Sequence, residues 1–259
     1  MDITSFVDLK ELQRIQDLFS DATGLAAIAV DAQGSYITKG SNFTEFCMKY
    51  TRGSAEGAKR CIKCDNECKG TYFCHAGLMD FASDIMVNGE RVGAVIGGQV
   101  LPNPPDAEKF RVIARELGIS EEAYLDALKK VPIRSEKMIR AAAQLLGSVV
   151  NQLVNLSYFK KLNEKKIELF DAEMGNAQKA AAEIKEITRG LEQVASMENI
   201  LSVNASIEAG RAGAAGAGFA VVAREIGQLS HNAAESYAAI QRQTEQVSAC
   251  ISKMSDIKL

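Results

Sequence analysis

The cysteines of this chain are concentrated in one short segment. Five of the six fall between positions 47 and 75, and a histidine directly follows the last of them. Closely spaced thiols and an imidazole suit a soft metal, because zinc and iron–sulfur clusters prefer sulfur and nitrogen ligands. The candidate metal-binding or ligand-binding residues are Cys47, Cys61, Cys64, Cys68, Cys74 and His75.

Three interpretations of these thiols remain open. The first is a zinc or iron–sulfur site, with Cys47 or His75 as alternates to the preferred ligands. That preferred set is Cys61, Cys64, Cys68 and Cys74. In the second interpretation the thiols line a small-ligand pocket or belong to the core, and in the third they sense redox state. The spacing lacks two paired C-x2-C motifs, so it does not decide among the three.

Catalytic chemistry is not indicated. His75 and His231 are the two histidines of the chain, and they are far apart in the sequence. No serine, histidine and acid grouping gathers around either one. We therefore expect that the chain is not an enzyme.

The elements that must position the thiols belong to a mixed α/β segment. Residues 24–105 carry most of the turn signals, and a short apolar run at Leu25–Val30 predicts a strand. A strand at Ser35–Lys39 and helices at 43–50 and 54–68 are expected to follow. Further strands are predicted at 73–75, 79–87 and 91–100, the last two joined by the hairpin signal Asn88-Gly89.

The second half of the chain has a different pattern. From residue 141 onward it contains no proline, and apolar residues recur at steps of three and four. These seams include Ile184, Ile187, Leu191, Val194, Leu201, Phe219, Val222, Ile226, Leu229, Ile240 and Val247. Between them Gly213, Gly216 and Gly218 permit a tight bend. We expect a coiled-coil hairpin whose arms bury both seams against each other and whose thin core favours dimerisation into a four-helix bundle.

The bulk composition narrows the class of protein. With 259 residues, 47% of them hydrophobic, the chain is long enough for a real core. A net charge of −3 gives no electrostatic reason to expect nucleic acid as a partner. The N-terminal residues do not form a signal peptide, and no apolar run reaches the length of a membrane span. We therefore expect no membrane span and a cytoplasmic location.

The stretch Val203–Ile226 resembles the signalling tip of methyl-accepting chemotaxis receptors. This resemblance implies contact with a chemotaxis histidine kinase and its coupling adaptor, a homodimer, and assembly into higher arrays. The residues that match the contact positions of the family are Asn204, Glu208, Arg211, Phe219, Val221 and Glu225. The chain departs from the family at Ala214, Ala217 and Gly227, where charged residues are common, so the tip carries less charge than usual.

A second resemblance covers roughly residues 8–130. Phe46-Cys47, Arg60-Cys61, the run Cys74–Ala82 and the run Gly97–Leu101 are similar to the PocR-type sensory domain. The resemblance implies a PAS-like module, proposed for small hydrocarbon derivatives such as diols. Cys47, Cys61, Cys74 and His75 match the family pattern, whereas Cys64 and Cys68 are additions in this chain.

Together these features predict an α+β chain with a PAS-like antiparallel-sheet sensor followed by a long helical hairpin. The expected divisions are 1–132 for the sensory domain, 133–175 for a helical connector and 176–259 for the signalling hairpin. The expected function is that of a chemoreceptor-like transducer, in which a small molecule, metal or redox event modulates a histidine kinase. The alternative is an interaction protein that senses nothing and joins or competes in receptor arrays.

Overall fold

A computed structural model describes residues 1–255 of the chain. These residues divide into two compact units, Met1–Asn163 and the part from Glu164 onward. We describe each unit by itself. In the described part of the chain, no helix is both long enough and apolar enough to cross a membrane.

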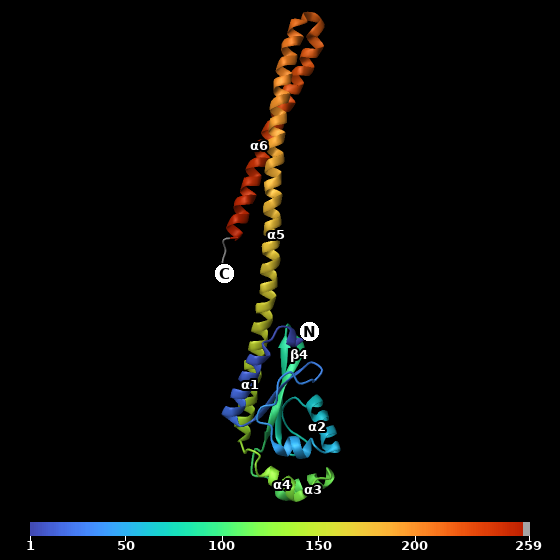
Figure 1. Ribbon diagram of the computed structural model, residues 1–259, viewed down its shortest axis with the longest axis vertical. Coiled ribbons are helices and arrows are strands. Elements are labelled where there is room, and N and C mark those ends of the chain that lie inside the picture. Colours follow the sequence, from blue (N-terminus) through green and yellow to red (C-terminus); the bar gives the residue numbers. More distant parts are fainter. Residues whose placement is uncertain (256–259) are drawn as a thin grey trace. The chain divides into compact units, whose positions relative to one another are not determined.

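The first unit is built on a four-stranded antiparallel sheet with the strand order β1-β4-β3-β2 (Figure 1). The strands are β1 (Ala26–Asp31), β2 (Gly70–Phe73), β3 (Met79–Val87) and β4 (Glu90–Val100). The predicted hairpin between the last two is confirmed. Asn88 and Gly89 both have positive φ angles, 51° and 79°, which is the requirement of a two-residue turn that matches the strand twist.

Helices surround this sheet, and several begin at a side chain that caps the first turn. The elements are η1 (Ile3–Ser5), α1 (Leu9–Thr23), η2 (Phe46–Thr51), α2 (Ala55–Glu67), α3 (Ala107–Glu116), α4 (Glu121–Leu128) and the start of α5 (Glu136–Arg211). Asp8 accepts hydrogen bonds from two N–H groups of α1, and Ser54 accepts one from α2. Such caps satisfy N–H groups that have no partner within the helix.

One face of the sheet forms the main core. Phe81 and Ile85 of β3 belong to the same buried cluster as Leu12 of α1 and Ile139 and Leu146 of α5. The beginning of α5 therefore packs as part of the first unit, although it falls in the segment predicted as a connector. A second cluster joins η2 to α3 and α4 around the fully buried Phe46 and Tyr124 rings, which stack at 4.3 Å between centroids.

Three local predictions differ from the structure. The returning strand expected at Ser35–Lys39 is reduced to an isolated bridge between Tyr36 and Val30. The helix expected at 43–50 is a wide π-type turn, η2, in which the Thr51 hydroxyl donates to the Phe46 carbonyl at 2.8 Å. The strand expected at 73–75 lies earlier, as β2, because residues 74–77 form a turn.

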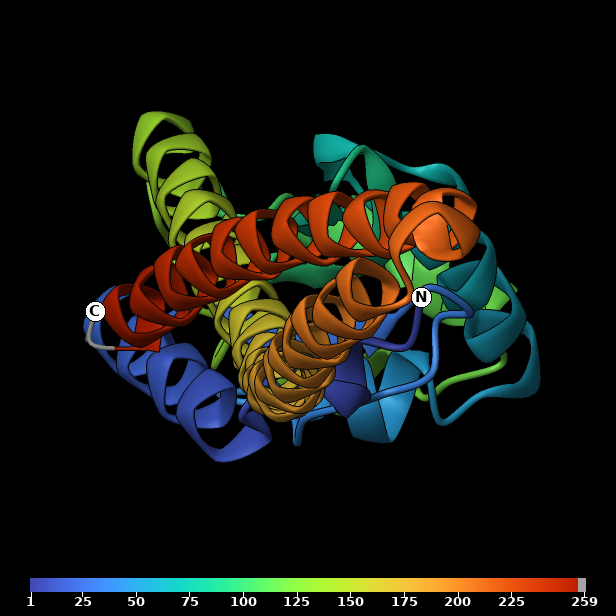
Figure 2. The same ribbon diagram turned by 90° about the horizontal axis from the view of Figure 1, so that it is seen from above.

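The second unit is a helical hairpin, as predicted. It consists of the later part of α5, the short helix η3 (Gly213–Gly216) and α6 (Ala217–Ser255). The two arms lie side by side near the turn in both views (Figures 1 and 2). The Ser230 hydroxyl of α6 donates to the Ala195 carbonyl of α5 at 2.5 Å.

The expectation that the arms bury the large apolar seams against each other is wrong. Ile187, Leu201, Phe219 and Leu229 remain 63–69% exposed in a single chain. The buried positions are separated by seven residues or a multiple of seven, and most of them hold small side chains. They are Ala181, Thr188, Ala195, Ser202, Ala209, Ala223, Ser230, Thr244 and Ile251. Small side chains allow two helices to approach closely, which explains their place at the contact between the arms.

The bend depends on two of the three predicted glycines. Gly213 has a φ of 58°, a conformation that favours glycine. A Cβ atom on Gly216 would lie 2.2 Å from the Ala209 carbonyl oxygen, so only glycine fits there. Gly218 has open space around it and lies within α6.

Candidate functional site

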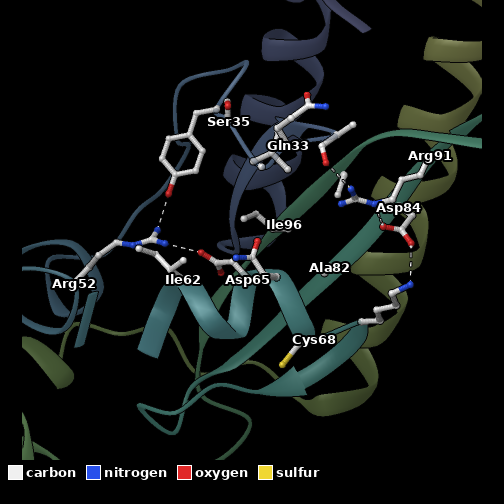
Figure 3. A pocket seen from close by; sticks show the side chains of 17 residues that line it. Gln33, Ser35, Arg52, Ile62, Asp65, Cys68, Ala82, Asp84, Arg91 and Ile96 are labelled. Carbon is white, nitrogen blue, oxygen red and sulfur yellow. Dashed lines mark hydrogen bonds and ion pairs between the residues drawn. The ribbon is translucent and has the colours of Figure 1, made fainter. Parts of the chain in front are cut away.

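The face of the sheet opposite the main core opens into a cavity of about 650 Å³ (Figure 3). Its floor is apolar and includes Val30, Ala94 and Ile96 from β1 and β4. Residues of α2, among them Ile62 and Asp65, line another side. This volume is typical of small-molecule sites. We call it the outer cavity.

Three ion pairs line the outer cavity, and two of them, formed by Arg91 and Lys69, share the Asp84 carboxylate. The Arg52 guanidinium lies 2.5 Å from the Asp65 carboxylate and donates to the Tyr36 hydroxyl at 2.6 Å. Elsewhere along the wall, Arg91 lies 2.6 Å from the Asp84 carboxylate. Figure 3 shows Arg52 pointing toward Asp65, and Arg91 pointing toward Asp84. The cavity thus combines an apolar floor with walls whose charges are mostly paired.

Two smaller cavities, of about 40 and 60 Å³, adjoin the outer one and share Arg52 and Asp65 with it. We call them together the inner chamber. Asp80 and Gln99 line both of its parts. The Arg52–Asp65 pair therefore stands at the boundary between the outer cavity and the inner chamber.

A strained bulge in the sheet positions the residues of the inner chamber. Gly98 has a φ of 117°, and Gln99, although not glycine, has a φ of 53°. This backbone directs the Gln99 N–H to the Asp80 Oδ1 atom at 2.7 Å. A Cβ atom on Gly98 would lie 2.9 Å from that same oxygen, so only glycine leaves room for the carboxylate. Strained backbone of this kind is common at binding sites.

Asp80 lies deep within the domain yet retains some surface toward the chamber. Burial disfavours the charged form and raises the pKa of Asp80 to about 6, while the Gln99 N–H opposes this shift. The Cys74 thiol also lowers the pKa of Asp80, although its geometry lies outside that of a hydrogen bond. Tyr72 of β2 is paired directly across the ladder with Asp80, so the two side chains share a face.

The structure brings five of the six predicted thiol-cluster residues around the 60 Å³ part of the chamber, and leaves one outside. The five are Cys47, Cys61, Cys64, Cys74 and His75. Cys68 ends α2 in an extended conformation and lines the outer cavity instead. Cys68 therefore leaves the common helix face because α2 ends there, although Cys64 still lies beside it.

Within the described residues, no group of three or more histidine, cysteine or acidic side chains is arranged to hold a metal ion. The Cys61 Sγ lies 3.2 Å from the His75 Nε2. The preferred metal set from the sequence is not assembled here, because Cys68 faces another cavity. The His75 Nδ1 atom is buried without a hydrogen-bond partner.

Three thiols of the chamber, Cys47, Cys61 and Cys74, are not activated for nucleophilic or redox chemistry. Burial raises the pKa of Cys61 to about 11, and it raises the pKa of Cys47 and Cys74 as well. Burial also lowers the pKa of His75, which keeps its ring neutral at neutral pH. Because the thiolate is the reactive form, these thiols are poor nucleophiles. Their environment is that of pocket walls.

The predicted contact residues of the tip lie on both arms and are all exposed. Asn204, Glu208 and Arg211 belong to α5, and Glu208 and Arg211 form an ion pair at 3.4 Å. Phe219, Val221 and Glu225 belong to α6. The arrangement mixes apolar and charged side chains that are free to meet another protein surface.

Gly227 is explained by packing between the arms. A Cβ atom on Gly227 would lie 2.8 Å from the Ser202 hydroxyl oxygen, so any other residue would require the Ser202 side chain to move. Where a basic residue is common in the chemoreceptor family, this chain has a glycine that allows close contact between the two helices.

The chain combines two classes of domain, a sensory domain and a chemotaxis signalling domain. Residues 5–158 match the sensory domain found in PocR, and the chain belongs to that family. Residues 151–257 match the methyl-accepting chemotaxis protein signalling domain. The predicted order of the two domains is therefore confirmed.

Curated relatives resemble one domain or the other. Regulatory protein PocR of Salmonella typhimurium is 31% identical over 59% of this chain and 52% of its own length. Chemoreceptor McpA of Caulobacter vibrioides is 44% identical over 24% of this chain and 9% of its own. PctB of Pseudomonas aeruginosa, a methyl-accepting chemotaxis protein, is 46% identical over 25% of this chain and 10% of its own length. The chain thus spans about half of PocR and a small part of each receptor. No solved structure matches it.

Besides the thiols and His75, the inner chamber contains residues that were not predicted as site residues. Arg52, Asp65, Tyr72, Asp80 and Gln99 come from different elements that only the fold brings together. Asp80 and Gln99 stand in the runs that carry the PocR resemblance, and the adjacent pair of glycines is a sequence signal for a bulge. Arg52 and Tyr72 have no such signal in the sequence.

Proposed function

We propose that this chain is a chemoreceptor-like transducer, in which a small molecule in the cavities of the PocR domain changes the activity of a chemotaxis-type histidine kinase. The kinase and its coupling adaptor would bind the exposed tip of the hairpin. The raised pKa values of Cys47, Cys61 and Cys74 favour a small-molecule signal over a redox signal. Such a transducer would work in the cytoplasm, where its kinase partner lies.

The continuity of α5 carries this proposal. Ile139 and Leu146, near the start of α5, pack in the core beneath the sheet that forms the outer cavity. Asn204, Glu208 and Arg211, near its end, lie among the tip residues. A ligand that favours one packing of the sensory core acts directly on this helix. Ligand binding would then shift the population of hairpin states, and the kinase would respond to that shift.

A dimer is part of the proposal. The large apolar side chains of both arms are exposed in a single chain, and the small-residue contact between the arms cannot cover them. A second hairpin would bury them in the centre of a four-helix bundle. Dimers could then meet at their tips in larger arrays.

The test is a binding assay of the full chain with a chemotaxis kinase and adaptor. Glu225→Lys reverses a charge at an exposed tip position and disturbs no ion pair of the described residues. Its matched control is Glu186→Lys, the same change at an exposed position of α5, about 33 Å from Glu208 at helical rise. We expect the first change to weaken binding by about tenfold or more and the second to leave it unaltered.

Equal binding of both variants would contradict a kinase-contacting tip. A tip that binds kinase normally, in a chain whose kinase activity responds to no ligand, would instead favour a non-sensing interaction protein. Kinase activity is therefore measured in the same reconstituted mixture, with and without a panel of small organic molecules.

A further inference from the structure

The inner chamber carries an excess of one negative charge. Asp65 and Asp80 are its two carboxylates, and Arg52 is its one permanent cation. The guanidinium of Arg52 is already engaged with Asp65 at 2.5 Å. Asp80 therefore forms no ion pair among residues 1–255, and the more distant charge of Arg52 only lowers its pKa, although a buried carboxylate is costly without a paired cation.

Asp80 also has an unused acceptor. Its Oδ1 atom accepts the Gln99 N–H, and within the described residues no further hydrogen bond to the carboxylate forms, although the Cys74 thiol lies near it. Asp80 lines both parts of the chamber, so this carboxylate is open to a ligand there. The Tyr72 hydroxyl, which lines the same chamber, likewise has no hydrogen-bond partner within the described part of the chain.

Aromatic rings form much of the remaining wall. Tyr36, Phe43 and Tyr72 all line the 40 Å³ part of the chamber, together with the apolar side chains of Ile28 and Ile96. The faces of aromatic rings attract organic cations, and this attraction grows when water is excluded. Carboxylate and aromatic walls together favour a positively charged head group of small size.

We propose that the inner chamber binds the ammonium head of a small primary amine, with Asp80 as its counter-ion. The head donates one N–H to the free oxygen of Asp80 and another to the Tyr72 hydroxyl. The apolar body of the amine extends past the Arg52–Asp65 pair toward Ile96, which lines both the chamber and the outer cavity. This inference rests on the proposed function, since it names the class of ligand for the same sensory domain.

The experiment compares three probes with the same three-carbon body: propan-1-amine, propan-1-ol and propanoate. Their heads are a cation, a neutral hydroxyl and an anion. Calorimetric titration into the full chain is expected to show that the amine binds about tenfold more tightly than the alcohol, because a charge-assisted hydrogen bond is the stronger one. Binding of the alcohol or of propanoate as tight as that of the amine overturns the proposal, and so does the absence of amine binding.

The variant Asp80→Asn tests the counter-ion, and Asp126→Asn is its control at an exposed position of α4. We expect the first change to remove the preference for the amine over the alcohol and the second to keep it. Tyr72→Phe, which removes only a hydroxyl, gives a second measure and should weaken amine binding. An unchanged amine preference in Asp80→Asn contradicts the proposal.

Failure here is distinguishable from failure of the proposed function. If the amine does not bind while Glu225→Lys still weakens kinase binding, the proposed ligand class is rejected and the proposed transducer function is retained. If the amine binds with the expected selectivity while Glu225→Lys binds the kinase normally, the proposed amine site is retained and the proposed transducer function is rejected.

Discussion

At the scale of single residues, Asp80 combines two features that destabilise the fold, a buried carboxylate and a strained backbone at its hydrogen-bond partner. It lies deep in the domain, and its backbone partner Gln99 is held at a positive φ. The gain is a carboxylate fixed in direction by one N–H and open on its other oxygen. A protein that only needed a stable sheet would gain nothing from this arrangement, so the arrangement is most simply explained by binding.

The pKa of Asp80 predicts a dependence of stability on pH. Its pKa in the folded chain is about 6, above the ordinary 3.8, so the folded chain holds the proton more tightly than the unfolded chain. The contribution of this group to stability therefore grows as pH falls through 6 and is complete below 3.8. At pH 8 the buried charge costs about 3 kcal/mol.

Asp80→Asn should remove that cost. We expect the free energy of unfolding of the variant to exceed that of the native chain at pH 8 by up to about 3 kcal/mol, with the difference disappearing near pH 4. Denaturant titrations at several pH values measure it, and Asp126→Asn again serves as control. Parallel pH profiles for Asp80→Asn and the native chain would refute a raised pKa.

At the scale of elements, the hairpin uses two kinds of apolar pattern for two purposes. Small residues such as Ala195, Ser202 and Ser230 hold the arms together, and large residues such as Leu201 and Leu229 point away from that contact. Large side chains at the small positions would separate the arms and displace the tip residues that both arms carry.

Ala195→Leu tests the small-residue contact. The added side chain has no room beside Ser230, and overpacking of this kind costs about 1–3 kcal/mol. Ala182→Leu places the same side chain at an exposed position of α5 and should change stability by less than about 0.5 kcal/mol. Denaturant unfolding followed by helical circular dichroism gives both values. Equal effects of the two changes would be inconsistent with this contact.

Elements with a strong local signal were predicted well. The bounds of β3 are those expected, and the Asn88-Gly89 turn follows it, because alternation and turn chemistry act over a few residues. The large apolar residues of the hairpin were expected to pack between the two arms, and the structure leaves them exposed in a single chain. A heptad pattern shows which positions are apolar, but it does not show whether the other arm or another chain covers them.

The candidate site was only partly accessible to sequence reasoning. The thiols and His75 were found because their spacing is local, and most of them do gather around one cavity. Arg52 and Asp80 line the same chamber, whose existence depends on the packing of η2, α2 and the sheet. Cys68 could not be separated from its neighbours in advance, because its departure depends on where α2 ends.

At the scale of the whole molecule, the exposed apolar side chains of the hairpin point to a second copy of the chain. Leu191, Val194, Ile226 and Leu229 are 37–69% exposed in a single chain. Burying the part that is still exposed would contribute hydrophobic stabilisation of about 0.5–2 kcal/mol for each of them. A two-fold dimer would bury each of these residues in both copies of the chain. The total hydrophobic stabilisation therefore favours association.

Leu229→Lys is expected to weaken the dimer. A lysine at this position would place a charge in the centre of the bundle, twice per dimer, and raise the dissociation constant by about tenfold or more. Gln228→Lys, at the neighbouring exposed polar position, is the control and should leave the dimer intact. Sedimentation velocity over a range of concentrations measures both. A native chain that is monomeric throughout that range would exclude the bundle.

The sevenfold repeat of small side chains has one more effect. Because Ala181, Thr188, Ala195, Ser202 and Ala209 are nearly alike, α6 could slide along α5 by one heptad, about 10 Å, and meet an almost equivalent surface. The turn removes this freedom, since Gly216 sits against Ala209 and no other stagger satisfies that contact. The two glycines of the bend thus determine which layers of the arms face each other, and a loosened turn would misalign the tip without altering any residue on it.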